Sequence, residues 1–210
     1  MSSRALQPIR IELKSDAPAF VTRINDVDQF VRLFALSYRH NLPQLPAFAA
    51  CKFKMAKQRL PSEADLALSL GACGGFVRSY ECCCAFYDVA PRADVCWTVD
   101  NLWAYNDVRE FNMLELDTLE RVHVKAVIFA MRYNDWFDSF VLSDAEMPQG
   151  AWSALAAMIA INTRITRLEL SQVHDVPRQA LAKLFAAMHD NRSCGVRALD
   201  VSRNTLDAPG

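Results

Sequence analysis

The chain has 210 residues, of which 52% are hydrophobic and 22% are charged. This length and apolar content are enough for a buried core, so the composition excludes a disordered chain. The 23 Lys and Arg residues almost balance the 24 Asp and Glu residues, and a formal charge of −1 excludes attraction to nucleic acid or an anionic membrane by net charge alone.

The cysteines and the longest apolar run indicate the cellular compartment in which the chain is expected. The seven cysteines are odd in number, and residues 1–10 lack the apolar core of a signal peptide. We therefore expect reduced thiols and a cytoplasmic chain. The longest apolar run, Ala154–Ile161, is less than half of the roughly 20 residues that a membrane-spanning helix needs. Any membrane contact is then expected to be peripheral and weak.

Residues 1–42 contain two strand patterns and one helix pattern. Residues 9–13 alternate between apolar and polar side chains, and residues 20–24 form a second candidate strand. A helix then begins at Asn25 or Asp26 and ends near Pro43. Its apolar stripe consists of Val27, Phe30, Val31, Phe34 and Tyr38. Two strands and one helix do not complete a domain.

Residues 43–62 are predicted to connect this region to the rest of the chain. Prolines at 43, 46 and 61 interrupt the segment. Its basic residues are Lys52, Lys54, Lys57 and Arg59. A solvated linker is the first interpretation, and lipid binding by the basic residues is the alternative.

Residues 63–107 predict a helical N-terminal cap. The pattern is helical from 63 to 88, with an interruption at three glycines, and it continues through Val95, Trp97 and Val99. A solenoid must cover the core of its first repeat, and aromatic side chains supply the area for this. The candidates are Phe76, Tyr80, Phe86, Tyr87, Trp97, Trp103 and Tyr105.

Residues 108–210 return the same apolar spacing four times. The last copy matches the leucine-rich-repeat pattern LxxLxLxxNxL at each apolar place and at its asparagine, Asn204. The copies start at Val108, Phe137, Ile165 and Val196, which are 29, 28 and 31 residues apart. This period suits repeats in which an α-helix follows each strand. The predicted fold is therefore α/β, a leucine-rich-repeat solenoid of the ribonuclease-inhibitor-like kind.

Helical patterns separate the expected strands. The first opens at Asp117 or Thr118 and runs through Val122, Val124, Val127 and Ile128, and the second covers Ala151–Ile161. The third carries Leu181, Leu184, Phe185 and Met188 on one face, with Pro177 in its first turn and Asp175 as its cap. Each helix is expected to pack between neighbouring repeats.

The residues between the apolar strand positions are expected on the opposite, concave face. This face is the usual binding surface of a solenoid. The candidate protein-binding residues are Glu110, Asn112, Ser139, Ser143, Arg167, Glu169, Ser171, Asp200 and Ser202, with Val141 and Ala198 in the remaining places. The alternative is that each is merely solvated, because a solenoid needs polar strand residues whether or not a partner binds.

No catalytic, cofactor-binding or metal-binding residues are predicted. The run Cys82–Cys84 lacks the paired spacing of a zinc site and has no nearby histidine, so we expect core thiols on a cap helix. No motif organises the four histidines, and each is expected at the surface or at a helix cap. These are His40, His123, His174 and His189.

Several blocks between Gly74 and Gly210 resemble the CARMIL family, large leucine-rich-repeat regulators of actin capping protein. The most specific blocks are Val95–Asp100 and Tyr133–Phe137, because a generic repeat does not require them. The others are Gly74–Phe76 with Tyr80, Cys83 and Tyr87, and Glu110–Asn112, Arg167–Leu170, Leu181–Leu184 and Ser202–Asp207.

The resemblance implies a non-enzymatic scaffold that regulates actin filament capping and assembly at the membrane edge, in the cytoplasm and associated with the cytoskeleton or plasma membrane. Its implied partners are actin-assembly proteins, with no nucleic acid and no cofactor. Residues 1–42 resemble the last part of the family's pleckstrin-homology-like domain, and no stretch matches the family's capping-protein-binding segment. The alternative is a generic leucine-rich-repeat binding or inhibitor protein unrelated to actin.

One further expectation concerns the last repeat. No polar cap follows it before Gly210, so its core side, including Leu199 and Val201, is expected to be exposed. The isolated chain should then self-associate.

Overall fold

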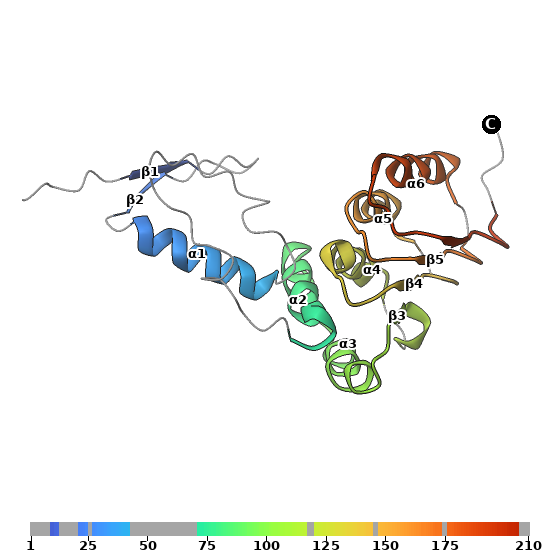
Figure 1. The fold of residues 1–210 in the computed structure, drawn as a ribbon, viewed down its shortest axis with the longest axis horizontal. Coiled ribbons are helices and arrows are strands. Elements are labelled where there is room, and N and C mark those ends of the chain that lie inside the picture. Colours follow the sequence, from blue (N-terminus) through green and yellow to red (C-terminus); the bar gives the residue numbers. More distant parts are fainter. Residues whose placement is uncertain are drawn as a thin grey trace, which may run out of the picture. The chain divides into compact units, whose positions relative to one another are not determined.

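A computed structural model of the chain describes residues 9–12, 21–24, 27–42, 71–116, 120–144, 147–173 and 176–205. The chain divides into two compact units, Met1–His40 with Pro46–Leu68 and Asn41–Leu45 with Ser69–Gly210, and each is described by itself (Figure 1). Predictions for the linker, for the start of the cap and for residues 25, 26, 117, 118, 174, 175 and 206–210 lie outside the described residues.

The first unit contains a hairpin and a helix. Strands β1 (Ile9–Glu12) and β2 (Val21–Ile24) are antiparallel, with Ile9 opposite Ile24. Helix α1 (Val27–Asn41) follows, as the apolar stripe predicted. Ring centroids of Phe34 lie 6.2 Å from Phe30 and 6.3 Å from Tyr38, so the aromatic residues of the stripe contact one another.

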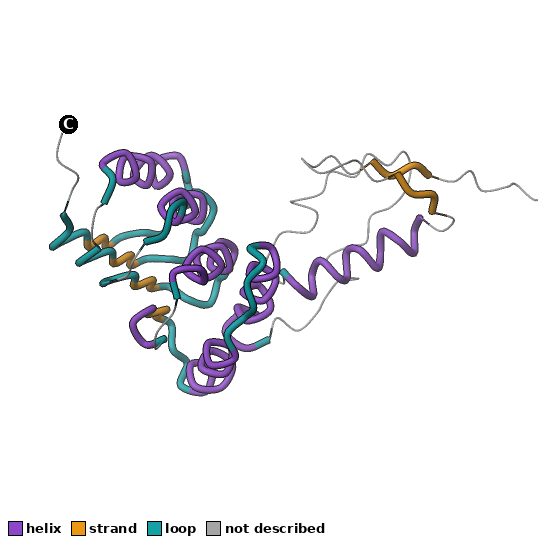
Figure 2. The backbone as a smooth tube through the Cα atoms, turned by 180° about the vertical axis from the view of Figure 1, so that it is seen from behind, coloured by secondary structure: helices purple, strands orange, loops and turns teal. Residues whose placement is uncertain are grey.

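The second unit contains a four-stranded parallel sheet in which the strands follow chain order. Each strand begins two residues after an expected repeat start. The strands are β3 (Glu110–Asn112), β4 (Ser139–Val141), β5 (Arg167–Glu169) and β6 (Ala198–Asp200). The connecting helices lie together along one side of the sheet (Figures 1 and 2). These are α4 (Arg121–Ala130), α5 (Ala151–Ile159) and α6 (Arg178–Asp190).

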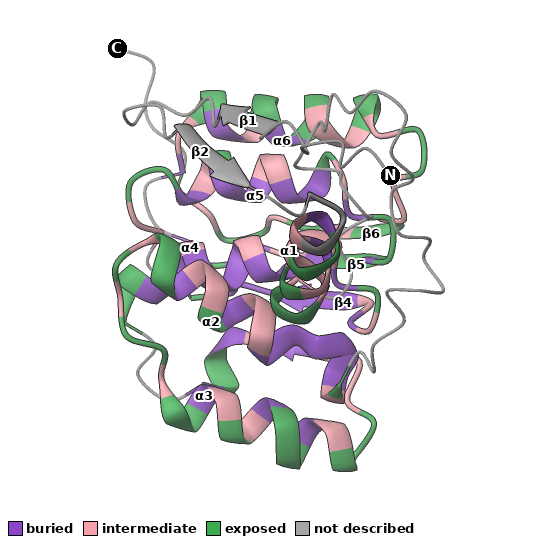
Figure 3. Cartoon of the chain, turned by 90° about the vertical axis from the view of Figure 1, so that its left-hand side faces the viewer, coloured by how far each residue is buried: buried purple, intermediate pink, exposed green. Residues whose placement is uncertain are grey.

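The core of this unit lies between the sheet and the helices. The middle residues of the first three strands, Phe111, Phe140 and Leu168, are fully buried, because alternate side chains of a strand point to opposite faces. Leu199 of β6 and Val201 are partly buried and pack against this core, whereas they were expected from the sequence to be exposed. In Figure 3, buried residues alternate with intermediate or exposed ones along α2, α4 and α5.

Two details of the helices differ from the sequence prediction. Pro177 is the N-cap residue of α6 instead of a residue of its first turn. Val122 and Phe185 lie on the outer sides of α4 and α6, where they are 49% and 46% exposed. The buried apolar face of each of these helices is narrower than predicted, because only part of the helix surface contacts neighbouring elements.

The described part of the predicted cap, residues 71–107, contains a glycine-rich 3₁₀ turn, η2 (Ala72–Gly75), which leads into α2 (Phe76–Phe86). Gly74 and Gly75 have φ of 67° and 73°, and this left-handed backbone explains why the helical pattern is interrupted here. The chain then returns through α3 (Ala93–Trp97) and the π-helical segment η3 (Thr98–Trp103). The thiol of Cys73 donates a hydrogen bond of 3.3 Å to the carbonyl of Val99 within that segment.

Aromatic rings join the cap to the first two strands. The ring centroid of Phe111 lies 4.8 Å from that of Phe76, 5.0 Å from that of Trp103 and 5.2 Å from that of Phe137. Tyr80 is buried as well. The expectation that Phe86, Trp97 and Tyr105 also cover this core is wrong, because they are 79%, 60% and 89% exposed on the outer side of the cap.

Three asparagines form a second repeating feature, which we call the asparagine ladder: Asn134, Asn162 and Asn191. The amide of Asn162 donates to the carbonyls of Met131 and Asn134, at 2.8 and 3.1 Å, and its oxygen accepts from the backbone of Arg164 and Ile165. Asn191 donates to the carbonyls of Ile159 and Asn162 in the same way. The amide of Asn134 donates to the carbonyl of Cys73, at 3.0 Å. Asn162 and Asn191 therefore each tie one strand–helix unit to the unit before it, and Asn134 ties the first unit to the segment before α2.

Candidate protein-binding face of the sheet

The predicted concave-face residues lie in rows across the sheet. Parallel pairing places Glu110 next to Ser139, Ser139 next to Arg167, and Arg167 next to Ala198. A second row contains Asn112, Val141, Glu169 and Asp200. Because the residues between the two rows point into the core, both rows stand on the opposite face of the sheet.

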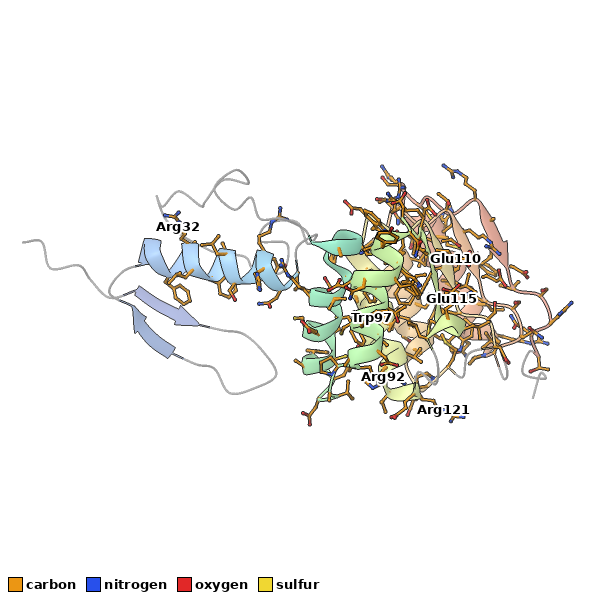
Figure 4. The ribbon with its side chains drawn as sticks, turned by 90° about the horizontal axis from the view of Figure 1, so that it is seen from below. Arg32, Arg92, Trp97, Glu110, Glu115 and Arg121 are labelled. Atoms are coloured by element: carbon orange, nitrogen blue, oxygen red, sulfur yellow. The ribbon has the colours of Figure 1, made fainter. Side chains whose placement is uncertain are left out.

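Arg167 is the centre of the most polar part of this face. One guanidinium nitrogen lies 2.8 Å from a carboxylate oxygen of Glu110, and the other lies 2.5 Å from one of Glu169. Figure 4 labels Glu110, whose other polar contact is the hydroxyl of Ser139 at 3.1 Å. The Arg167 side chain remains 50% exposed, so a partner can still reach it.

Serines hold the second carboxylate from the other side. The hydroxyl of Ser143 donates to Glu169 at 2.8 Å, and the hydroxyl of Ser171 lies 3.3 Å from the same oxygen. The two hydroxyls are 2.9 Å apart. We call these side chains, together with Glu110, Ser139 and Arg167, the sheet-face network.

The exposure of the predicted residues is uneven. Ser139, Ser143 and Ser171 are 5–8% exposed, and Val141 is 4% exposed, so these four are covered by neighbouring side chains. For these four residues the alternative interpretation, that they are merely solvated, is therefore wrong. Ser139 and Val141 belong to β4, whose outward positions are flanked by those of β3 and β5.

The remaining predicted residues bond to nearby backbone. The side chain of Asn112 accepts from the amide of Leu114 at 3.0 Å, and that of Asp200 accepts from the amide of Ser202 at 2.8 Å. The Ser202 backbone and hydroxyl lower the pKa of Asp200, so this exposed carboxylate stays ionised. The charged part of the face is thus three carboxylates and one guanidinium, an arrangement suited to polar recognition.

Buried groups elsewhere have environments that oppose nucleophilic chemistry. Burial raises the pKa of Cys73 and Cys83 to about 12 and that of Cys96 to about 11, which disfavours the reactive thiolate. Within the described ranges, no group of His, Cys, Asp and Glu side chains could hold a metal ion. No helix in those ranges is long and apolar enough to span a membrane.

The surface position expected for His123 is wrong. Its side chain is 5% exposed between α2 and α4, with Nδ1 3.0 Å from the hydroxyl of Tyr80 and 4.0 Å from the thiol of Cys84. Burial lowers the pKa of His123 and raises that of Tyr80, so both are neutral at neutral pH. The burial of His123 could have been inferred from the sequence, because the nearby Val124 and Val127 mark a buried face of the helix.

Comparisons with known proteins give a consistent set of relatives. The chain is 25% identical over 191 residues to Protein CARMIL of Dictyostelium discoideum, a match that covers 89% of the chain and 18% of the relative. It is 26% identical over 149 residues to human capping protein, Arp2/3 and myosin-I linker protein 3, which covers 71% of the chain and 11% of the relative. The chain is a relative of the CARMIL proteins.

The similarity extends beyond the CARMIL proteins, and it covers a small part of each relative. The chain is also 25% identical over 154 residues to the Rho GTPase-activating protein gacW of Dictyostelium discoideum, covering 72% of the chain and 14% of that protein. No family model matches the chain. The chain spans less than a fifth of the length of the CARMIL relatives.

The structure gives roles to the two blocks that carried the resemblance. In Tyr133–Phe137, Asn134 belongs to the asparagine ladder, Phe137 is buried, and the indole of Trp136 donates to the carbonyl of Val108 at 2.9 Å. The guanidinium of Arg109 lies 3.7 Å from the Trp136 ring. In Val95–Asp100, Val95 and Val99 are buried while Trp97 is exposed.

Proposed function

We propose that the chain is a non-catalytic protein-interaction module of an actin-regulating scaffold. Residues 108–210 act in this proposal as leucine-rich repeats, residues 63–107 as their N-terminal cap, and residues 1–42 as the end of a pleckstrin-homology-like domain. Support comes from the strand–helix period, from the hairpin that precedes α1, and from the CARMIL relatives.

The observation that carries the proposal is the sheet-face network. Its side chains continue across three neighbouring strands, and ion pairs hold Arg167 between two carboxylates before any partner is present. A polar surface that is already ordered loses less side-chain entropy when a partner binds. We propose that this face binds a protein of the actin-assembly machinery, in the cytoplasm and near the membrane edge.

The name of one relative suggests specific partners to test. The human relative is named for capping protein, Arp2/3 and myosin-I. The full chain would be immobilised and presented with each of these purified proteins, and with cytosolic extract. We expect at least one actin-assembly protein to be retained. Retention of only unrelated proteins would favour the generic leucine-rich-repeat binder, and retention of nothing would count against both.

Matched variants locate the binding surface. Glu110→Ala/Arg167→Ala removes one acidic and one basic side chain from the sheet face, and Asp190→Ala/Arg192→Ala removes the same pair of charges from exposed positions at the end of α6 and just after it. Binding should fall about tenfold or more in the first variant, a loss typical of central interface residues. If both variants bind the partner equally well, the sheet face is not the binding surface.

A further inference from the structure

One buried hydroxyl connects three elements of the second unit. The hydroxyl of Tyr80, on α2, lies 3.0 Å from Nδ1 of His123, on α4. The same hydroxyl accepts a hydrogen bond of 3.5 Å from the backbone amide of Arg92, the N-cap residue of α3, which Figure 4 labels. The exposed fraction is 0% for Tyr80 and 5% for His123. We call the bonded pair of Tyr80 and His123 the cap joint, because it links the cap to the first helix that follows a strand of the sheet.

The two hydrogen bonds of Tyr80 assign the protons of the cap joint. The backbone amide of Arg92 donates to the Tyr80 oxygen, so the hydroxyl can donate its own proton to Nδ1 of His123. The imidazole is then neutral, with its proton on Nε2. A proton added to Nδ1 faces the hydroxyl proton, so the hydrogen bond that Tyr80 donates is lost. The cap joint is therefore made by the neutral histidine.

Neutral groups face the ring from α2 and α5. The Cys84 thiol, on α2, lies 4.0 Å from Nδ1 of His123. Burial raises the pKa of Cys84 and that of Tyr80, so both side chains stay protonated. Helix α5 packs against α4 and contains no ionisable residue. A positive charge on His123 therefore gains no compensating charge from these two helices.

The charged groups that act on the ring come from the starts of α3 and α4. Glu120 and Asp94 favour the charged imidazole, and Arg92 opposes it. Asp94 is already paired with Arg92, and both carboxylates are exposed to water, which screens their charge. On α4 itself, Arg121 and Lys125 are cations. Burial of the ring outweighs these groups and lowers its pKa, so the histidine is neutral at neutral pH.

Aromatic packing also holds the cap against the first strand. Ring centroids of Phe76 and Trp103 lie 4.8 and 5.0 Å from that of Phe111, and the centroid of Tyr80 lies 6.0 Å from that of Phe76. The strength of this packing does not change in the pH range in which histidine titrates. Acid therefore acts on the attachment of the cap through the cap joint. Because each unit of a repeat array contacts its neighbours, an end element can open while units further along stay folded.

We propose that the cap joint is an acid-sensitive latch. Protonation of His123 breaks its hydrogen bond with Tyr80, and α2 with the start of α3 then opens from α4 while α5, α6, β5 and β6 stay folded. At neutral pH the latch is closed. The open population rises as the pH falls below about 6.5, the pKa of a histidine in water, because the open state binds the proton more tightly than the closed state. Opening uncovers the aromatic core at β3 and does not involve the sheet face.

Hydrogen exchange of the full chain, followed by mass spectrometry, measures opening element by element. Exchange would be compared at about pH 7.5 and about pH 5.5, on either side of the histidine titration, after correction for the intrinsic effect of pH on amide exchange. We expect protection in α2 to fall by about threefold or more beyond the fall in α5 and α6. The imidazole NMR signal of His123, assigned through His123→Gln, should titrate at a lower pH than that of the exposed His189.

Three variants test the cap joint itself. His123→Gln keeps a side chain that can accept from Tyr80 but does not titrate, so the extra loss of α2 protection at low pH should disappear. Tyr80→Phe deletes the hydroxyl and should lower α2 protection by about threefold or more already at neutral pH. His189→Gln, on α6, should keep the native response to pH. If His123→Gln does not fold, Tyr80→Phe and the NMR titration of the native chain decide the question.

Several results would overturn the proposal. Equal loss of protection in α2, α5 and α6 at low pH would mean that acid unfolds the whole unit. An unchanged pH response in His123→Gln would assign the effect to another group, and a His123 signal that titrates at or above the pH of His189 would leave the latch without its proton switch. Native α2 protection in Tyr80→Phe at neutral pH would show that this hydrogen bond does not hold the cap. Loss of partner binding to the sheet face affects none of these measurements.

Discussion

The asparagine ladder and the sheet-face network are both polar and both repeat from unit to unit, yet their partners differ. Ladder asparagines bond to backbone carbonyls and amides of two successive units and are largely removed from water. Network side chains bond to other side chains, and its charged members keep 20–50% of their side-chain surface exposed. A buried polar group bonded to backbone fixes the fold, whereas exposed ion pairs add little stability and leave a surface for recognition.

The most severe test of this comparison is Asn162→Ala. Asn162 is 5% exposed and makes four hydrogen bonds to backbone groups, all of which the substitution removes. We expect the free energy of unfolding to fall by about 2–4 kcal/mol. Denaturant unfolding followed by circular dichroism measures this change. Asn101→Ala removes an exposed asparagine that bonds only to Trp97 within its own helix, and it should cost less than about 0.5 kcal/mol.

A smaller effect is expected from pH at the buried His123. Burial lowers its folded-state pKa below the unfolded value of about 6.5. The unfolded chain therefore binds more protons in the window between these two values. The contribution of His123 to stability is full above about pH 6.5 and is lost as the pH falls toward the folded-state pKa. The charged groups with the largest effects on this titration are Glu120, Arg92 and Asp94.

Unfolding midpoints measured between about pH 8 and pH 5 test the titration of His123. His123→Gln should be less stable at neutral pH and should lose the part of the pH dependence that this group contributes. His189→Gln serves as the control, because His189 is exposed on α6. A pH profile of His123→Gln parallel to that of the native chain would contradict the assignment.

The smallest stability effect is expected at the sheet face. Arg167→Ala removes two ion pairs from a side chain that is 50% exposed, so the free energy of unfolding should change by no more than about 1 kcal/mol. The same variant should weaken the proposed partner binding. If it destabilises the chain as much as Asn162→Ala does, the sheet-face network is structural and the contrast with the ladder fails.

Much of the fold was predictable from the sequence, because apolar spacing records the alternation of a strand and the turn of a helix. Copies starting at Val108, Phe137, Ile165 and Val196 placed all four strands of the sheet two residues after each start. The asparagine ladder is equally periodic, since its members stand 28 and 29 residues apart. A search for apolar spacing does not detect it, because asparagine is polar.

The sequence by itself determined where the strands and helices lie and which side chains share a face of the sheet, since both follow from local periodicity. Only the tertiary structure decided which side chains of a face are exposed to solvent or to a partner. It covered Ser139 and Val141 with their neighbours, left Arg167 open, placed His123 beside Tyr80 and turned Trp97 outward. The physical reason is that burial depends on side chains far away in the sequence, which no local pattern specifies.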